Sequence, residues 1–305
     1  MNPPLEGKKH IVQLICLLLL VAFGVCFGSC LGTLLNSMIS HTTTLKGAGN
    51  PAGFLRLSQC CMSLVGFLLP SLLFAFCCDG KWFQYNNGDK KPHYLLVNIT
   101  LILSIVLLPL IAVLSQWNQQ WHLPESWSHL EVALRTMEDQ AKSMVHTMTF
   151  NSSYGALALN MIVLAILPAV AEEFLFRGTF QQLLYKWSGK PHLAIWITAT
   201  IFSAVHLQFF GFIPRLLLGV YLGYLFYWSK SVWLPILAHF LHNALSLLVE
   251  FTFLHRGVFV DDIDLTKVYG AVPMLIACTL VTAMSMVFMW RVQKDLADPK
   301  SQSKR

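Results

Sequence analysis

Residues 153–180 read SYGALALNMIVLAILPAVAEEFLFRGTF. A helix needs about 20 mostly apolar residues to cross a bilayer, and this run is long enough. It nevertheless contains Glu172, Glu173 and Arg177. Ionisable side chains inside a membrane are costly, so they usually face a bundle interior and serve a function. The stretch therefore predicts a membrane helix that carries polar groups into a helix bundle.

The composition of the chain agrees with this prediction. Of the 305 residues, 55% are hydrophobic and 12% are charged, whereas a soluble domain has about 25% charged residues. These values exclude a soluble globular enzyme, a disordered chain and a secreted disulfide scaffold. We expect an all-α fold, a polytopic membrane helix bundle with about eight transmembrane helices. The predicted spans are residues 11–39, 58–78, 93–115, 153–180, 193–208, 212–228, 231–252 and 270–290.

The positive charges indicate the orientation. The net charge is +6, and the larger share of the lysines and arginines falls on the same side of the predicted spans as the N-terminus. By the positive-inside rule we expect both termini in the cytoplasm and no nucleic-acid partner. The first apolar run follows Lys8 and Lys9 but is too long for a signal peptide, so we expect a retained span. The eight cysteines lie in or beside apolar runs without a CxxC pair, which is typical of thiols buried in lipid or in a bundle core.

The long loop at residues 116–152 has a helical pattern. Apolar residues recur at spacings of three and four from Leu130 to Met148, which predicts an amphipathic helix. Ser128 and Glu131 have the spacing of a capping box at its start. This helix would lie on the outer membrane surface or form a lid over the bundle.

Polar side chains concentrate in the predicted spans four to seven. Glu173 and Arg177 are four residues apart, so they can neutralise each other on one helix face. Glu172 is rotated about 100° from Glu173 and is left without that partner. His239 and Asn243 are also four residues apart and can point into the same space. These spans are therefore expected to surround one polar cavity.

The depths of these groups in the membrane also match. Glu172 and His206 each lie 17 residues from Gly189, in the polar hairpin between spans four and five. In an antiparallel helix pair they would be level. Glu172 and His239 would each lie about 12 Å inside the hydrocarbon edge, at 1.5 Å per residue. The three groups are thus predicted to meet, while His242 could face the cavity or a neighbouring helix.

Three motifs resemble one known family. They are EExxxR at residues 172–177, FxxxH at 202–206 and HxxxN at 239–243, in that order and on different spans. Together they resemble the motifs of the CAAX-protease and bacteriocin-processing (CPBP) family of intramembrane proteases. The resemblance covers about residues 150–250 and implies that family's eight-helix α bundle.

The resemblance implies a role for each motif residue. Glu172 would activate the attacking water, helped by His206. His239 and Asn243 would polarise the scissile carbonyl and stabilise its oxyanion, and the Glu173–Arg177 ion pair would keep the site in shape. Peptide hydrolysis needs such a general base and such donors. The resemblance thus predicts an intramembrane endopeptidase, with a membrane-associated protein or peptide as substrate.

Cofactor and function leave alternatives open. Glu172, His206 and His239 could hold a zinc ion with an open position for water, although the sequence has no HExxH motif. A metal-free, glutamate-dependent hydrolase fits as well. The alternatives to an enzyme are a non-catalytic membrane protein, as in bacteriocin immunity or a scaffold, and a proton-coupled carrier.

The predicted organisation follows from these assignments. Residues 1–150 would form an N-terminal transmembrane scaffold of three spans plus the amphipathic loop helix. Residues 151–252 would form the catalytic, CPBP-like membrane core, and residues 253–305 the last span and a basic cytoplasmic tail. We expect an integral protein of the bacterial inner membrane, with the lipid bilayer as its surroundings.

Overall fold

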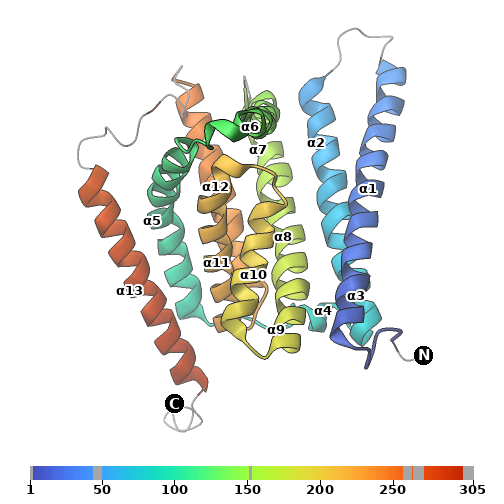
Figure 1. The fold of residues 1–305 in the computed structure, drawn as a ribbon, viewed down its shortest axis with the longest axis vertical. Helices are drawn as coiled ribbons and strands as arrows, with labels where there is room; N and C mark the ends of the chain where they lie inside the picture. Colours follow the sequence, from blue (N-terminus) through green and yellow to red (C-terminus); the bar gives the residue numbers. More distant parts are fainter. Residues whose placement is uncertain (1–2, 44–49, 151–152, 257–262, 264–270, 298–305) are drawn as a thin grey trace.

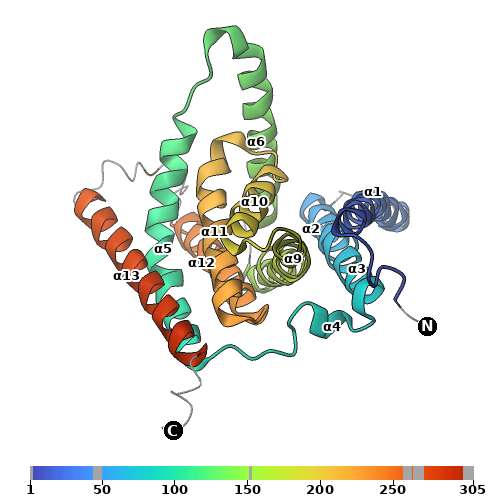
Figure 2. The same ribbon diagram turned by 60° about the horizontal axis from the view of Figure 1, so that its bottom comes forward.

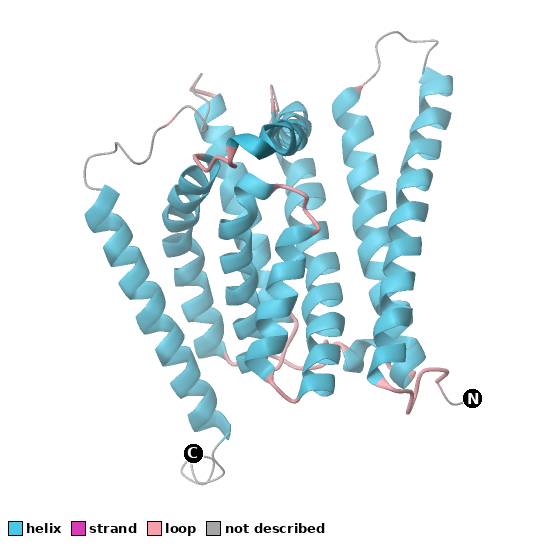
Figure 3. Cartoon of the chain, in the orientation of Figure 1, coloured by secondary structure: helices cyan, strands magenta, loops and turns pink. Residues whose placement is uncertain are grey.

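The structure is a computed structural model that describes residues 3–43, 50–150, 153–256, 263 and 271–297. Within these ranges the chain forms helices and no strand (Figure 3). The prediction of an all-α, polytopic helix bundle is confirmed. Short π-helical and 3-10 segments, labelled η, lie between or within the α-helices. The first half of the chain contains α1 (His10–Thr43), α2 (Pro51–Cys61), η2 (Met62–Leu68), α3 (Leu69–Asp79), α4 (Trp82–Tyr85), α5 (Tyr94–Gln119), η3 (Glu125–Trp127) and α6 (Ser128–Thr149).

The second half contains the polar segment and the last helix. It begins with one nearly continuous helix, Tyr154–Ser188, and four separate and shorter helices follow. The elements are α7 (Tyr154–Asn160), η4 (Met161–Ile166), α8 (Leu167–Glu173), η5 (Phe174–Gln181), α9 (Gln182–Ser188), α10 (Pro191–Ala204), η6 (Phe209–Gly211), α11 (Phe212–Ser229), α12 (Trp233–Leu254) and α13 (Ala271–Ala297).

The fifth predicted span differs from the prediction. Seven helices in the described part of the chain are long and apolar enough to cross a membrane, but the segment predicted at 193–208 overlaps only the 14-residue helix α10. At 1.5 Å per residue α10 is about 21 Å long, shorter than the hydrocarbon core. His206 therefore lies in the turn after α10 and not inside a spanning helix. Hydropathy missed this end because apolar residues continue through the turn.

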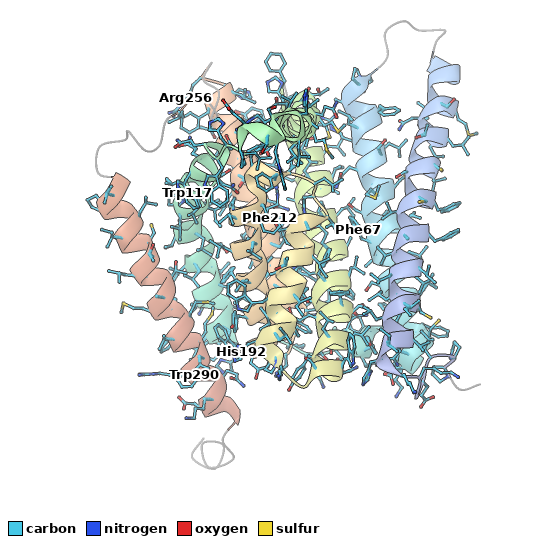
Figure 4. The ribbon with its side chains drawn as sticks, in the orientation of Figure 1. Phe67, Trp117, His192, Phe212, Arg256 and Trp290 are labelled. Carbon is cyan, nitrogen blue, oxygen red and sulfur yellow. The ribbon has the colours of Figure 1, made fainter. Side chains whose placement is uncertain are left out.

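The two ends of the bundle are distinct. α1 begins and α13 ends at the same end of the bundle (Figure 1). His192, at the start of α10, lies at this end, while Phe212 lies toward the opposite end (Figure 4). Which end faces the cytoplasm stays a prediction from the charge pattern.

Helix α6 crosses the bundle at the end opposite to the start of α1 (Figures 1 and 2). It is tied to α2, where Arg56 Nη2 donates to the carbonyl of Met148 at 2.8 Å. It is also tied to α12, where Thr149 Oγ1 donates to Glu250 Oε1 at 2.8 Å. The predicted amphipathic helix is therefore present and packs on several spans.

The predicted capping box is wrong. Ser128 already has helical dihedral angles, because a 3-10 turn precedes it and Trp127 occupies the N-cap position. Glu131 instead accepts a hydrogen bond from the backbone N–H of Leu123 at 2.7 Å and binds Arg135 Nη2 at 2.8 Å. These contacts close the turn between α5 and α6. They lower the pKa of Glu131 to about 2, chiefly through the Leu123 N–H and then through Arg135.

Helix α1 packs on α2, η2 and α3 through small residues. A Cβ atom at Gly24 would lie 2.6 Å from Pro70 Cγ and 2.7 Å from the carbonyl oxygen of Val65. A Cβ atom at Gly28, one turn further, would lie 3.1 Å from the carbonyl oxygen of Cys61. Glycine thus permits the close backbone approach that is typical of membrane helix pairs.

Candidate active site

The helix that carries Glu172 and Glu173 is not a regular α-helix. The seven-residue helix α8 lies between two π-helical stretches, η4 and η5. Pro168 stands in the first turn of α8 and has no N–H to continue the preceding hydrogen-bond ladder, so a widened turn before it relieves the conflict. π-Helical turns are frequent at functional sites. Here they set the direction in which the two glutamates project.

The ion pair predicted from the spacing of four residues is present. Arg177 Nη1 lies 2.6 Å from Glu173 Oε1, and both side chains are fully buried. Arg177 Nη2 also donates to the carbonyl of Gly219 on α11 at 3.0 Å. The guanidinium lies 4.7 Å from the centre of the Phe202 ring on α10. Arg177 therefore joins three helices.

Glu173 has a second partner that sequence reasoning missed. Its Oε1 atom also lies 2.8 Å from Nδ1 of His239 on α12, and His239 is buried. A carboxylate at Nδ1 makes that nitrogen the hydrogen-bond donor and fixes the ring orientation. The other nitrogen, Nε2, then faces Glu172, whose Oε2 atom lies 3.9 Å away. The signal that could have suggested this contact is the equal predicted depth of the two spans.

His206 is oriented by its own helix end. Its Nδ1 atom donates to the carbonyl of Phe202 at 2.7 Å, which leaves Nε2 free to accept a proton. Its ring packs edge-on against Phe202 at 5.1 Å between centroids, and the His239 ring contacts the same phenyl group at 5.9 Å. Both imidazoles thus pack edge-on against the ring of Phe202.

The loop that bears His206 is held from two other helices. Glu138 of α6 is buried and accepts a hydrogen bond from the backbone N–H of Phe210 at 3.0 Å. The guanidinium of Arg135, one turn earlier on α6, lies 3.9 Å from the centre of the Phe210 ring. Asn118 at the end of α5 accepts from the N–H of Ile213 at 2.9 Å. We call Glu138, Arg135 and Asn118 the loop clamp.

Two further polar residues have other contacts. Asn243 lies one turn beyond His239 on α12, and its Nδ2 atom donates to the carbonyl of Leu164 at 3.4 Å, a long contact. Ser203 Oγ donates to the carbonyl of Phe212 at 2.7 Å. The hydroxyl of Ser203 is therefore engaged in joining α10 to α11, and does not form a dyad with His206.

All these groups except the loop clamp belong to one segment of the chain. Residues 154–245 match the family model described as Type II CAAX prenyl endopeptidase Rce1-like. The segment is Rce1-like. The family resemblance predicted from the three motifs is confirmed over this range, which contains every predicted site residue.

A curated relative also matches part of the chain. It is the "Uncharacterized protein YpbD" of Bacillus subtilis (strain 168), 32% identical over 89 residues. The match covers 28% of this chain and 42% of that protein, so the chain spans less than half of the relative's length. No solved structure matches the chain.

The donor set of the Rce1-like segment does not fit a zinc site. Among the residues that the structure describes, no three His, Cys, Asp or Glu side chains are close enough together to hold a metal ion. His239 Nε2 and Glu172 Oε2 lie 3.9 Å apart, and a catalytic zinc ion needs three protein ligands plus water. The predicted ligand set of Glu172, His206 and His239 is thus unsupported as a zinc centre.

A polar pocket lies away from these residues. It is lined by His10 and Gln13 of α1, by Asp79 and Tyr85, and by Lys186 of α9. Burial raises the pKa of the Tyr85 phenol, with a smaller contribution from Cys78. The lining includes none of the predicted site residues, so the pocket is separate from the Rce1-like motifs.

Proposed function

We propose that this protein is an intramembrane endopeptidase that hydrolyses a peptide bond of a membrane-associated protein or peptide, with water activated by Glu172. The observation that supports the proposal is the buried Glu172–His239–Glu173–Arg177 chain of contacts within the Rce1-like segment. Short motifs recur by chance in apolar helices, but a linked set of their side chains from different helices is rarely accidental.

Glu172 is suited to act as the general base. It is buried, its Oε2 atom lies 3.9 Å from His239 Nε2, and it has no ion-pair contact with Arg177. A water molecule bound to Glu172 would lose a proton to the carboxylate as its oxygen attacks the carbonyl carbon. The same proton would then pass to the leaving amine when the C–N bond breaks. His206, with Nε2 free, would help to hold the water.

His239 and Asn243 would act on the carbonyl oxygen. Glu173 accepts the Nδ1 proton of His239, so Nε2 can donate to the developing oxyanion when the ring carries both protons. Asn243 projects one turn beyond, and its amide would supply a second donor. Arg177 holds Glu173 in place, because its Nη1 atom lies 2.6 Å from the Oε1 atom of that carboxylate. Every catalytic group in this scheme is a side chain of this protein.

The Glu172→Gln variant tests the proposal. It retains the shape of the side chain but cannot accept a proton, and a positioned general base contributes about 10²–10⁴-fold. Membrane proteins from cells with wild-type protein and from cells with the variant would be compared by sequencing of new N-termini. We expect cleavage products that occur with the wild type and disappear with the variant, at equal protein abundance.

Glu250→Gln is the matched control. This carboxylate also belongs to the helix bundle, but it binds Thr149 at the end of α12 and is outside the site. The control should retain all products. Wild-type cleavage by purified Glu172→Gln protein would refute the assignment of the base, and the carrier and scaffold alternatives would then be favoured.

A further inference from the structure

Arg215 differs from the other cation near the site. It lies in the first turn of α11, where its Nη2 atom donates to the neutral amide oxygen of Gln208. Its Nη1 atom is buried and has no hydrogen-bond partner. Within the described part of the chain no carboxylate lies within 4.0 Å of this guanidinium, whereas Arg177 is paired with Glu173 at 2.6 Å. Arg215 is therefore a cation with an unused donor.

The surroundings of Arg215 favour an added negative charge. A helix N-terminus carries a partial positive charge, and cations there are unfavourable. The first turn of α11 has no acidic residue to offset this charge. Arg215 as a whole is partly buried, and a partly desolvated charge without a close partner is stabilised when a counter-ion binds it. An anion at Nη1 would accept a hydrogen bond from the unused donor. It would also offset the positive charge of the guanidinium and the partial positive charge of the helix N-terminus.

The position of Arg215 connects it to the catalytic groups. Glu172 and His206 both lie within electrostatic range of it. Its guanidinium packs against the loop after His206, because a Cβ atom at Gly211 would lie only 2.7 Å from Nη1. Glu138 of the loop clamp is also within electrostatic range and offsets part of the charge of Arg215, but no ion pair joins the two side chains, and Glu138 Oε2 accepts a hydrogen bond from the N–H of Phe210. An anion bound at Arg215 would thus lie within electrostatic range of the groups proposed to hydrolyse the peptide.

We propose that Arg215 binds a carboxylate of the substrate and so positions the peptide for cleavage. That the ligand is a peptide rests on the proposed function. That Arg215 binds an anion does not. Carboxylates match the planar fork of a guanidinium, and charge-assisted pairs of this kind are strong. The carboxylate comes either from the chain terminus or from an acidic side chain, and the experiment separates these sources.

The test measures binding and does not depend on catalysis. The thermal unfolding midpoint of purified protein in detergent is followed against N-acetyl-L-leucine and against its neutral amide, N-acetyl-L-leucinamide. A third probe, the α-amide of N-acetyl-L-glutamate, carries its carboxylate only on the side chain. We expect one of the two acids to bind at least ~10-fold more tightly than leucinamide, as a hydrogen bond to a charged group provides. The tighter acid identifies the source.

Variants assign the effect to one residue. Arg215→Gln should abolish the preference for the acid, and Arg215→Lys should reduce it, since an ammonium group keeps the charge but loses the fork. Arg56→Gln is the matched control, because Arg56 is an arginine whose donors bind Asn160 and the carbonyl of Met148. It should leave the preference unchanged.

The outcomes separate this proposal from the proposed function. Equal binding of acids and amide, the same stabilisation by sodium chloride, or a preference that survives in both Arg215 variants would each overturn the carboxylate site. The Glu172→Gln protein should retain the preference for the acid. If that protein also retains peptidase activity, the assignment of the base fails while the carboxylate site stands.

Discussion

Helices α1 and α2 meet through glycines, whereas α8 and α12 meet through Glu173 and His239. In the first region the helices carry many exposed apolar side chains, and α1 is largely exposed on its outer faces. In the second region the Rce1-like helices bury a carboxylate, a guanidinium and an imidazole in direct contact. The first interface depends on close approach of the backbone, and the second on charge compensation.

This difference predicts two kinds of response to mutation. An interface of small residues loses stability in proportion to the volume that is added. A buried ion pair responds abruptly, because removal of one partner leaves a charge without compensation. The difference also separates stability from activity, since the groups proposed to act on the substrate lie only in the second region.

The largest effect is expected from Arg177→Ala. It leaves Glu173 buried without its cation and should reduce the free energy of unfolding by about 3–5 kcal/mol. Protein abundance in membranes and the unfolding midpoint in detergent measure this loss. The double variant Glu173→Gln with Arg177→Met should regain part of the stability but not the activity, because His239 then lacks the carboxylate at Nδ1. Normal abundance of the single variant would contradict the assigned pairing.

The helix content and the ion pair could be predicted from the sequence, because both depend on local spacing. Hydropathy also located most of the spans, but the end of α10 depends on a turn whose residues are as apolar as the helix. The contact between Glu173 and His239 was missed because it depends on how α12 packs against α8. Glu138 was missed for a similar reason, since its partner is a backbone N–H that lies 72 residues away.

A smaller effect is expected at the glycine interface. Gly24→Ala places a methyl group against the carbonyl of Val65 and against Pro70, and should cost about 1–3 kcal/mol. The unfolding midpoint measures this cost. Activity per folded molecule should be unchanged, because this interface is apart from Glu172. Gly155→Ala is the control, since its Cβ atom would meet only Ser153 Oγ at 3.8 Å. An unchanged midpoint for Gly24→Ala would contradict the close packing of α1.

The smallest effect concerns Glu131, which closes the turn between α5 and α6. Its pKa is lowered from 4.5 to about 2 in the folded protein, so the unfolded chain binds more protons between these values. Its contribution to stability is thus complete above about pH 4.5 and is lost as the pH falls toward 2. Unfolding midpoints of the wild type and Glu131→Gln, followed from pH 7 to pH 3, should converge only below about pH 4.5. Convergence already at pH 6 would contradict the contacts with Leu123 and Arg135.

The loop clamp has a consequence for modularity. The Rce1-like match begins at residue 154, but Asn118, Arg135 and Glu138 precede it and hold the loop of His206. A fragment cut at the limits of the match would therefore contain every motif residue and still lack the supports that place one of them. The segment that matches the family is therefore smaller than the part of the protein that must be inherited, transplanted or engineered as a whole, which also includes the loop clamp.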